Sequence, residues 1–341
     1  MSVSSYSVTT PHQGAKSPAG ELSLTASRRW TRRLARSRRE NFVVVSMLLP
    51  RRMRQPFYDL YAFCRTADDV ADESKNDAEA IERLAEYRRW IDFVFSAIET
   101  AGDETVGHGA AKTRRDPDRS VAAVAGIRWP AGTPALFPAF ADTVARYRLP
   151  KRPLDDLLDA FVADQHHRPY PTLDALLQYC RCSADPVGRL ILSLGGCLDE
   201  ETAVLSDSIC TGLQLVNFWQ DVRRDASIGR IYVPLEIMDR FGWTASDLRH
   251  AIAENRPTPP EIRQAIAHLC EDARTRLQSG LPLAGFVPRW LANDVRLFAH
   301  GGLATVAAIE AIDFDVLRQR PVVPRRTQLR LVAMACLGRL R

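Results

Sequence analysis

Four carboxylates crowd the segment from Asp68 to Glu73, directly after an apolar and aromatic run. Asp68 and Asp72 stand four residues apart, a spacing that places both on one face of a helix. Like charges at this spacing destabilise a helix by roughly a few tenths of a kcal/mol, so a positive partner should offset them. A divalent cation would do so. The alternative is an acidic helix end in contact with solvent, which a lone pair of aspartates does not exclude.

A second acidic segment lies about 150 residues further along the chain, again among apolar and aromatic residues. Its polar members recur at the spacing of one helix face: Gln214, Asn217, Asp221 and Asp225. A row of amides and carboxylates facing a protein interior is costly unless it binds something polar. Two such helices facing each other would present their carboxylates to a shared cavity, which suits a hard cation that bridges to phosphate oxygens. The two segments together therefore predict Mg2+ bound with a diphosphate.

Arginines near both segments could donate hydrogen bonds to such a diphosphate. Arg65 stands one turn before Asp68, and Arg224 and Arg230 flank the second acidic pair. For any single arginine, an ion pair at the surface is the favoured alternative. The neighbouring aromatic residues are Phe63, Phe218 and Trp219. For each, a place in the core is favoured over a catalytic role, and together they imply an apolar cavity.

The elements that position these residues are predicted to be helices throughout. The chain has 341 residues, of which 46% are hydrophobic, enough for a large core. Apolar residues recur at helical spacing, few segments alternate with period two, and the glycine patterns of Rossmann and P-loop nucleotide sites do not occur. Proline and glycine mark the predicted helix stops: 149–150, 168–171, 256–260 and 280–282. We predict an all-α fold in a single domain.

Two stretches are predicted to lie outside this helical domain. Residues 1–27 are rich in Ser, Thr, Gly and Pro, which indicates a disordered N-terminal arm. A polar insertion with Gly, Pro and paired charges interrupts the helical pattern near residues 101–134. The domain itself is predicted to span residues 28–341.

Charge and cysteine content limit the other classes of function. The 7 cysteines are scattered and form no CxxC pair, which disfavours a zinc ribbon or a disulfide framework and favours the cytoplasm. No apolar run approaches the roughly 20 residues that cross a bilayer. The net charge of +5 is concentrated in the arginine-rich segment 28–54. Binding of a nucleic acid or an anionic membrane surface through that segment is the alternative from another class, but it leaves both acidic rows unexplained.

The two acidic segments, in this order and at this separation, resemble those of the squalene and phytoene synthases, and the likeness runs from about Arg38 to Arg320. The segment Gly229–Glu236 matches the one that follows the second acidic motif in that family. The resemblance implies an all-α isoprenoid synthase fold with a central cavity. It also implies a prenyl diphosphate as substrate and Mg2+ as cofactor, with no nucleic acid as partner.

The resemblance also assigns roles to individual residues. Five are implied to hold the metal and its diphosphate: Asp68, Asp72, Asn217, Asp221 and Asp225. Others are implied to bind the substrate: Arg65, Asn41, Gln214, Arg230 and, more weakly, Arg320. Tyr179 matches an active-site tyrosine, with a packed core tyrosine as the equally weighted alternative.

A narrower likeness points to the hydroxysqualene synthase branch, which acts in bacterial hopanoid biosynthesis. Three segments match that branch: Glu40–Phe42, Tyr179–Gly188 and the sequence of residues 214–221. Where condensing relatives carry Ser-x-Ser-Phe and Ala-Gly-x-Val-Gly, this chain has Arg39–Phe42 and Ala184–Gly188. Both departures disfavour a two-substrate condensation.

That branch converts presqualene diphosphate and water to hydroxysqualene and pyrophosphate. The nearest alternative within the family is a head-to-head prenyl transferase that makes presqualene diphosphate or phytoene. The resemblance leaves room for peripheral association with the inner face of the membrane and for contact with neighbouring enzymes of the hopanoid pathway.

Overall fold

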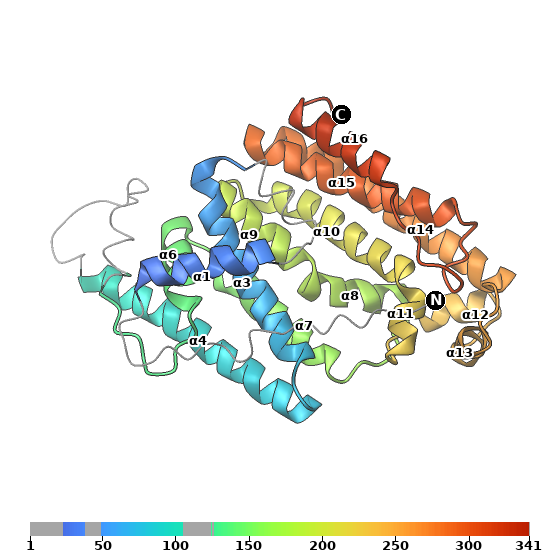
Figure 1. Cartoon of the computed structure of the whole chain (residues 1–341), viewed down its shortest axis with the longest axis horizontal. Helices are drawn as coiled ribbons and strands as arrows, with labels where there is room; N and C mark the ends of the chain where they lie inside the picture. The colour runs from blue at the N-terminus through green and yellow to red at the C-terminus, as the bar shows by residue number, and fades with distance from the viewer. Residues whose placement is uncertain (1–22, 38–48, 105–123, 125, 341) are drawn as a thin grey trace.

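The computed structural model describes residues 23–37, 49–104, 124 and 126–340. Helices make up the regular structure of these residues, and no strand occurs among them, so the predicted fold class is confirmed (Figure 1). The helices follow one another in this order: α1 (Leu24–Ser37), α3 (Arg51–Asp72), α4 (Asp77–Glu104), α6 (Phe137–Tyr147), α7 (Lys151–Asp164), α8 (Leu173–Ser183), α9 (Asp185–Gly195), α10 (Glu200–Gln220), α11 (Val222–Ser227), α12 (Leu235–Arg240), α13 (Ala245–Ala253), α14 (Pro260–Gly280), the 3-10 helix η1 (Leu281–Gly285), α15 (Arg289–Glu310) and α16 (Arg325–Cys336).

The helices end where proline and glycine predict. Each predicted stop falls between two helices or, at residues 280–282, where α14 gives way to η1. Among the described residues, five helices begin after a side chain that accepts a hydrogen bond from a backbone N–H of the first turn: Ser23 before α1, Asn76 before α4, Thr172 before α8, Asp199 before α10 and Thr244 before α13. Such caps satisfy one of the N–H groups that a helix start leaves without a partner.

The first helix begins earlier than the predicted end of the N-terminal arm. Helix α1 starts at Leu24, and Ser27 is buried, with its hydroxyl oxygen accepting a hydrogen bond from the Ala139 N–H at 2.9 Å. Local composition, on which the predicted end of the arm at about residue 27 depends, carries no information on a long-range contact of this kind. The preceding residues 1–22 lie outside the described part. At the polar insertion, α4 continues to Glu104, and residues 105–123 and 125 are likewise not described.

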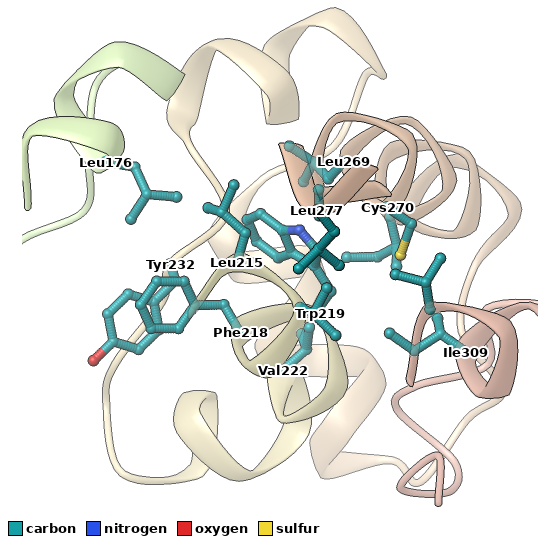
Figure 2. Close-up of a cluster of buried hydrophobic side chains, with 14 of the residues drawn as sticks. Leu176, Leu215, Phe218, Trp219, Val222, Tyr232, Leu269, Cys270, Leu277 and Ile309 are labelled. Carbon is teal, nitrogen blue, oxygen red and sulfur yellow. The ribbon is translucent and has the colours of Figure 1, made fainter. Parts of the chain in front are cut away.

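The core consists of two groups of buried side chains. One group lies where α10 packs against α14 and α15, around the fully buried Trp219 (Figure 2). The other lies between α3, α4, α6 and α7, where Phe63 stacks on Phe140 with ring centroids 4.6 Å apart. Trp290 of α15 packs against both groups, and its ring meets the edge of Phe57 in α3. The two halves of the chain therefore share one interior.

The aromatic residues beside the acidic segments belong to this interior, as predicted. Phe63 and Trp219 are fully buried, and Phe218 is 5% exposed. Burial of each such ring stabilises the fold by roughly 2 to 3 kcal/mol and fixes the rotation of α3 and α10 about their own axes. In the part of the chain that the structure describes, no helix is both long and apolar enough to cross a bilayer.

One buried carboxylate in α15 predicts how stability depends on pH. Asp294 is 1% exposed, and neither of its carboxylate oxygens has a hydrogen-bond partner among the described residues. Burial raises the pKa of this carboxyl to about 7. Between about pH 4 and pH 7 the unfolded chain therefore releases a proton that the folded chain keeps, so stability falls as pH rises through this range.

We expect the substitution Asp294→Leu to remove this slope and to stabilise the protein at neutral pH by about 1 to 4 kcal/mol. Urea unfolding of the wild type and the variant, at acidic and neutral pH, measures the difference. Asp239→Leu, at an exposed position of α12, is the matched control. An identical pH slope in wild type and Asp294→Leu would contradict the prediction.

Candidate functional site

The first acidic segment occupies the C-terminal end of α3. Arg65 pairs with two carboxylates of its own helix, Asp68 at 2.9 Å and Asp69 at 2.6 Å. Asp72 lies in the last turn, with 57% of its side chain exposed. Arg65 thus has the local ion-pair role that was weighed against diphosphate binding, although its charge still lies beside the acidic end of the helix.

The second acidic segment is not one continuous helix, contrary to the prediction. Helix α10 ends at Gln220, and Asp221 stands at the break before α11, with φ −107° and ψ 16°. The Asp225 N–H still donates to the Asp221 carbonyl oxygen at 2.9 Å, so the two carboxylates stay on adjacent turns. Asn217 is exposed one turn earlier and Gln214 is half-buried. The periodic sequence pattern does not reveal the break, because Asp221 and Asp225 are four residues apart with or without it.

Arg320 reaches this break from the far end of the chain. Its guanidinium donates two hydrogen bonds to the carboxylate of Asp221, from Nη2 at 3.0 Å and from Nε at 2.5 Å. Arg224 lies further away, with 3.8 Å between its Nη1 and the same carboxylate, and its side chain is 74% exposed. Of the two arginines, Arg320 therefore lies closer to the Asp221 carboxylate, although the sequence supported it only weakly as a binding residue.

Arg230 links the two acidic segments. The chain leaves α11 through Gly229, whose φ of +83° is a conformation that glycine adopts without strain. The Arg230 N–H donates to the Asp225 carbonyl oxygen at 2.8 Å, and its Nη2 lies 3.9 Å from the Asp72 carboxylate in α3. The ends of α3 and α11 therefore approach each other, as the prediction of a shared site requires.

Aromatic rings form a wall beside this meeting point. Phe218 stacks on Tyr232 with ring centroids 3.8 Å apart, and Tyr179 and Tyr170 pack around them (Figure 2 shows the stacked pair). We call these four residues the aromatic wall. The wall adjoins a small pocket lined by Phe218, Val222, Asp225, Arg230, Ile231, Tyr232, Val233 and Leu248.

Asp164, which sequence reasoning missed, is the polar partner of this wall. The Tyr179 hydroxyl donates to its carboxylate at 2.9 Å. Burial raises the pKa of Asp164 to about 6, while the Tyr179 hydrogen bond and the charge of Arg230 act in the opposite direction. A single aspartate at the end of a helix carries no periodic signal, so only the packing of α7 against α8 reveals it.

His167 positions the loop that carries Arg230. Its Nε2 accepts a hydrogen bond from the Ile231 N–H at 3.0 Å. Burial lowers the pKa of the imidazole, which favours the neutral form that this acceptor role needs.

The acidic groups have the chemistry of a hard-cation site. Burial raises the pKa of Asp225 to about 6, and the neighbouring charge of Asp221 adds to the shift. The donors are carboxylate and amide oxygens, which Mg2+ prefers. No three acidic, histidine or cysteine side chains of the described residues form a ready cluster. Mg2+ needs none, because it is commonly held by one or two carboxylates, waters and substrate phosphates. The residues present therefore fit the ion. Asn41, the remaining predicted binding residue, lies outside the described part.

The all-α fold brings two acidic helix ends together beside aromatic rings. A site of this kind suits a class of proteins that bind a diphosphate joined to an apolar group, with the acidic ends near the diphosphate and the rings near the apolar group. The family profile described as squalene/phytoene synthase matches residues 35–327. The chain belongs to the squalene/phytoene synthase family.

Relatives with different names are about equally similar. The phytoene synthase of Cereibacter sphaeroides is 30% identical over 305 residues, 87% of this chain and 76% of the relative. The hydroxysqualene synthase of Rhodopseudomonas palustris is 29% identical over 250 residues, 72% of this chain and 71% of the relative. The crystal structure of squalene synthase HpnC from Alicyclobacillus acidocaldarius is 35% identical with a TM-score of 0.71, covering 87% of this chain and 97% of that one.

Proposed function

We propose that this enzyme converts presqualene diphosphate and water to hydroxysqualene and pyrophosphate with Mg2+. The observation that carries the proposal is the approach of Arg230 to Asp72, which unites the two acidic segments beside the aromatic wall. The relatives bear hydroxysqualene, presqualene diphosphate and phytoene names alike. The choice among these reactions therefore rests on this chain's own departures from the condensing pattern at 39–42 and 184–188.

The polar end of the site would bind the diphosphate and promote breaking of the carbon–oxygen bond that joins it to the apolar group. The metal would be held by oxygens of Asp68, Asp72, Asn217, Asp221 and Asp225. When bound, it supplies fixed positive charge that stabilises the departing diphosphate. Arg230 and Arg320 lie among the same carboxylates and would donate to diphosphate oxygens.

The aromatic wall would serve the apolar part of the reaction. The faces of aromatic rings carry partial negative charge, so Tyr179, Phe218 and Tyr232 can stabilise a carbocation without bonding to it. Their burial also keeps bulk water from the cation. Asp164 balances the charge of Arg230 at the boundary between the wall and the acidic ends.

Presenting the two substrates separately tests the proposal. Purified protein with Mg2+ should release pyrophosphate from presqualene diphosphate and form hydroxysqualene, with or without NADPH. Farnesyl diphosphate alone should release none. Pyrophosphate release from farnesyl diphosphate only, or phytoene formation from geranylgeranyl diphosphate, would favour the head-to-head transferase that the 30% identity to phytoene synthase suggests.

The hydroxyl of Tyr179 offers a second test of the site. We expect Tyr179→Phe to lower pyrophosphate release about tenfold, because Asp164 loses its hydrogen-bond donor. The free energy of unfolding should change by only about 1 kcal/mol. Tyr170→Phe is the matched control, since Tyr170 packs against Tyr179 with ring centroids 5.6 Å apart, whereas Tyr179 is the residue that donates to Asp164. Equal activity in the two variants would show that Tyr179 is a packing residue.

A further inference from the structure

Polar groups with unused hydrogen-bonding capacity lie at the junction of α8 and α9. Helix α8 ends at Ser183 and α9 begins at Asp185. Asp185 is 2% exposed and accepts one hydrogen bond, from the Thr211 hydroxyl of α10 at 2.8 Å. The Ser183 hydroxyl oxygen is buried and has no partner among the described residues. We call Ser183, Asp185 and Thr211 the junction cluster.

Ser183 of α8 and Thr211 of α10 lie on the same helix faces as Tyr179 and Phe218, and Asp185 joins them through its hydrogen bond with Thr211. Tyr179 of α8 and Phe218 of α10 face each other with ring centroids 6.4 Å apart. Ser183 follows Tyr179 by one turn, and Thr211 precedes Phe218 by two turns. At 1.5 Å per residue, the cluster is about 6 to 10 Å along these faces from the wall. Gln214 lies between them on α10 and is half-buried.

Close packing of α9 on α10 holds the cluster together. A Cβ at Gly188 would lie 2.3 Å from Ser206 Oγ and 2.7 Å from Cys210 Sγ, so a larger residue would force these two side chains to move. The approach sets Asp185 against Thr211. Burial, with the charge of Asp207, raises the pKa of Asp185 to about 7, a value suited to accepting a proton near neutral pH.

Buried polar groups without protein partners are the groups that hold ordered water. The ring faces of the aromatic wall offer a water no strong hydrogen-bond partner. The Asp164 carboxylate beside them already accepts from Tyr179 and faces the charge of Arg230, so further partners of the water are expected along the same helices. We propose that the junction cluster holds the water that captures the carbocation, with Asp185 accepting its proton. This inference rests on the proposed function and names the residues that select water as the quenching reagent.

The step balances in atoms and charge. A lone pair of the water oxygen forms the new carbon–oxygen bond with the cation. One water proton passes to the Asp185 carboxylate, and the other remains as the hydroxyl proton of the product. Asp185 returns its proton to solvent before the next cycle. No oxidant or reductant takes part.

The ratio of alcohol formed to pyrophosphate released tests this role. Ionisation takes place at the acidic helix ends, so Asp185→Leu should keep pyrophosphate release within a few-fold of wild type while the hydroxysqualene fraction falls about tenfold or more. Hydrocarbons formed by proton loss should replace the alcohol. Asp185→Asn keeps an acceptor oxygen and should restore part of the fraction. Ser183→Ala, which removes one oxygen atom, is a second variant and should lower the fraction in the same direction.

An unchanged hydroxysqualene fraction in Asp185→Leu and Ser183→Ala would overturn the inference. So would a parallel loss of pyrophosphate release and alcohol in folded variants, because that result would place Asp185 in ionisation or packing. Cys182→Ser, a neighbouring half-buried position, is the control and should keep the wild-type ratio. Failure of the proposed function has a different signature, since the wild-type protein itself would then form no hydroxysqualene from presqualene diphosphate.

Discussion

Replacing Asp225 with alanine should lower pyrophosphate release from presqualene diphosphate by about two to three orders of magnitude. Burial and the neighbouring charge of Asp221 raise the pKa of Asp225, and its backbone carbonyl oxygen also accepts a hydrogen bond from the Arg230 N–H. Loss of its oxygens would remove a metal contact and leave the diphosphate charge less stabilised. Steady-state release of pyrophosphate measures the effect, with circular dichroism to verify folding.

A control variant and a double variant sharpen this result. Asp239→Ala removes an exposed carboxylate of α12 and should behave as wild type. If Asp72 and Asp225 serve one shared site, the double variant should lose little more than the more impaired single variant, because residues that act as a unit are not additive. Losses that multiply, or an Asp225→Ala variant within about threefold of wild type, would contradict a shared site.

Removal of divalent metal should abolish the reaction. Excess EDTA is expected to reduce pyrophosphate release by at least about a thousandfold, and Mg2+ added beyond the chelator should restore it. The reason is that Arg230 and Arg320 are already engaged with Asp72 and Asp221, so the arginines alone leave the diphosphate charge largely uncompensated.

A binding measurement supports this test without relying on turnover. Mg2+ and inorganic pyrophosphate together should raise the thermal unfolding midpoint of the wild type, since ligands that bind only the folded state stabilise it. Asp225→Ala should show a much smaller rise, and Asp239→Ala a normal one. Undiminished activity in EDTA, or equal thermal shifts in all three proteins, would remove the metal from the proposal.

The acidic segments illustrate which parts of a site can be predicted from local sequence. Helical spacing alone placed Asp68 with Asp72 and Asp221 with Asp225, and the structure keeps each pair on adjacent turns. The same spacing implied an unbroken helix, but Asp221 interrupts it. Periodicity reports the face of a residue and is insensitive to a single irregular dihedral angle.

The arginines show the opposite case. Arg65 and Arg230 were candidates because each lies near an acidic motif, and Arg320 was a weaker candidate because it matches a family position. In the structure Arg65 pairs within its own helix, Arg320 binds Asp221 across the chain, and Arg230 approaches Asp72. The partner of a long flexible cation depends on which helix ends meet, which is a property of packing.

Residue spacing and nearby proline or glycine were sufficient to predict the helical class, four of the helix stops and the two carboxylate pairs, because each depends on interactions within a few residues. The contacts of Asp164 with Tyr179 and of Asp185 with Thr211 could not be predicted in this way. Each of these contacts joins two different helices. Such contacts form only when each helix has the right rotation about its axis and the right crossing angle with its neighbour. Buried side chains from all parts of the chain determine these angles jointly.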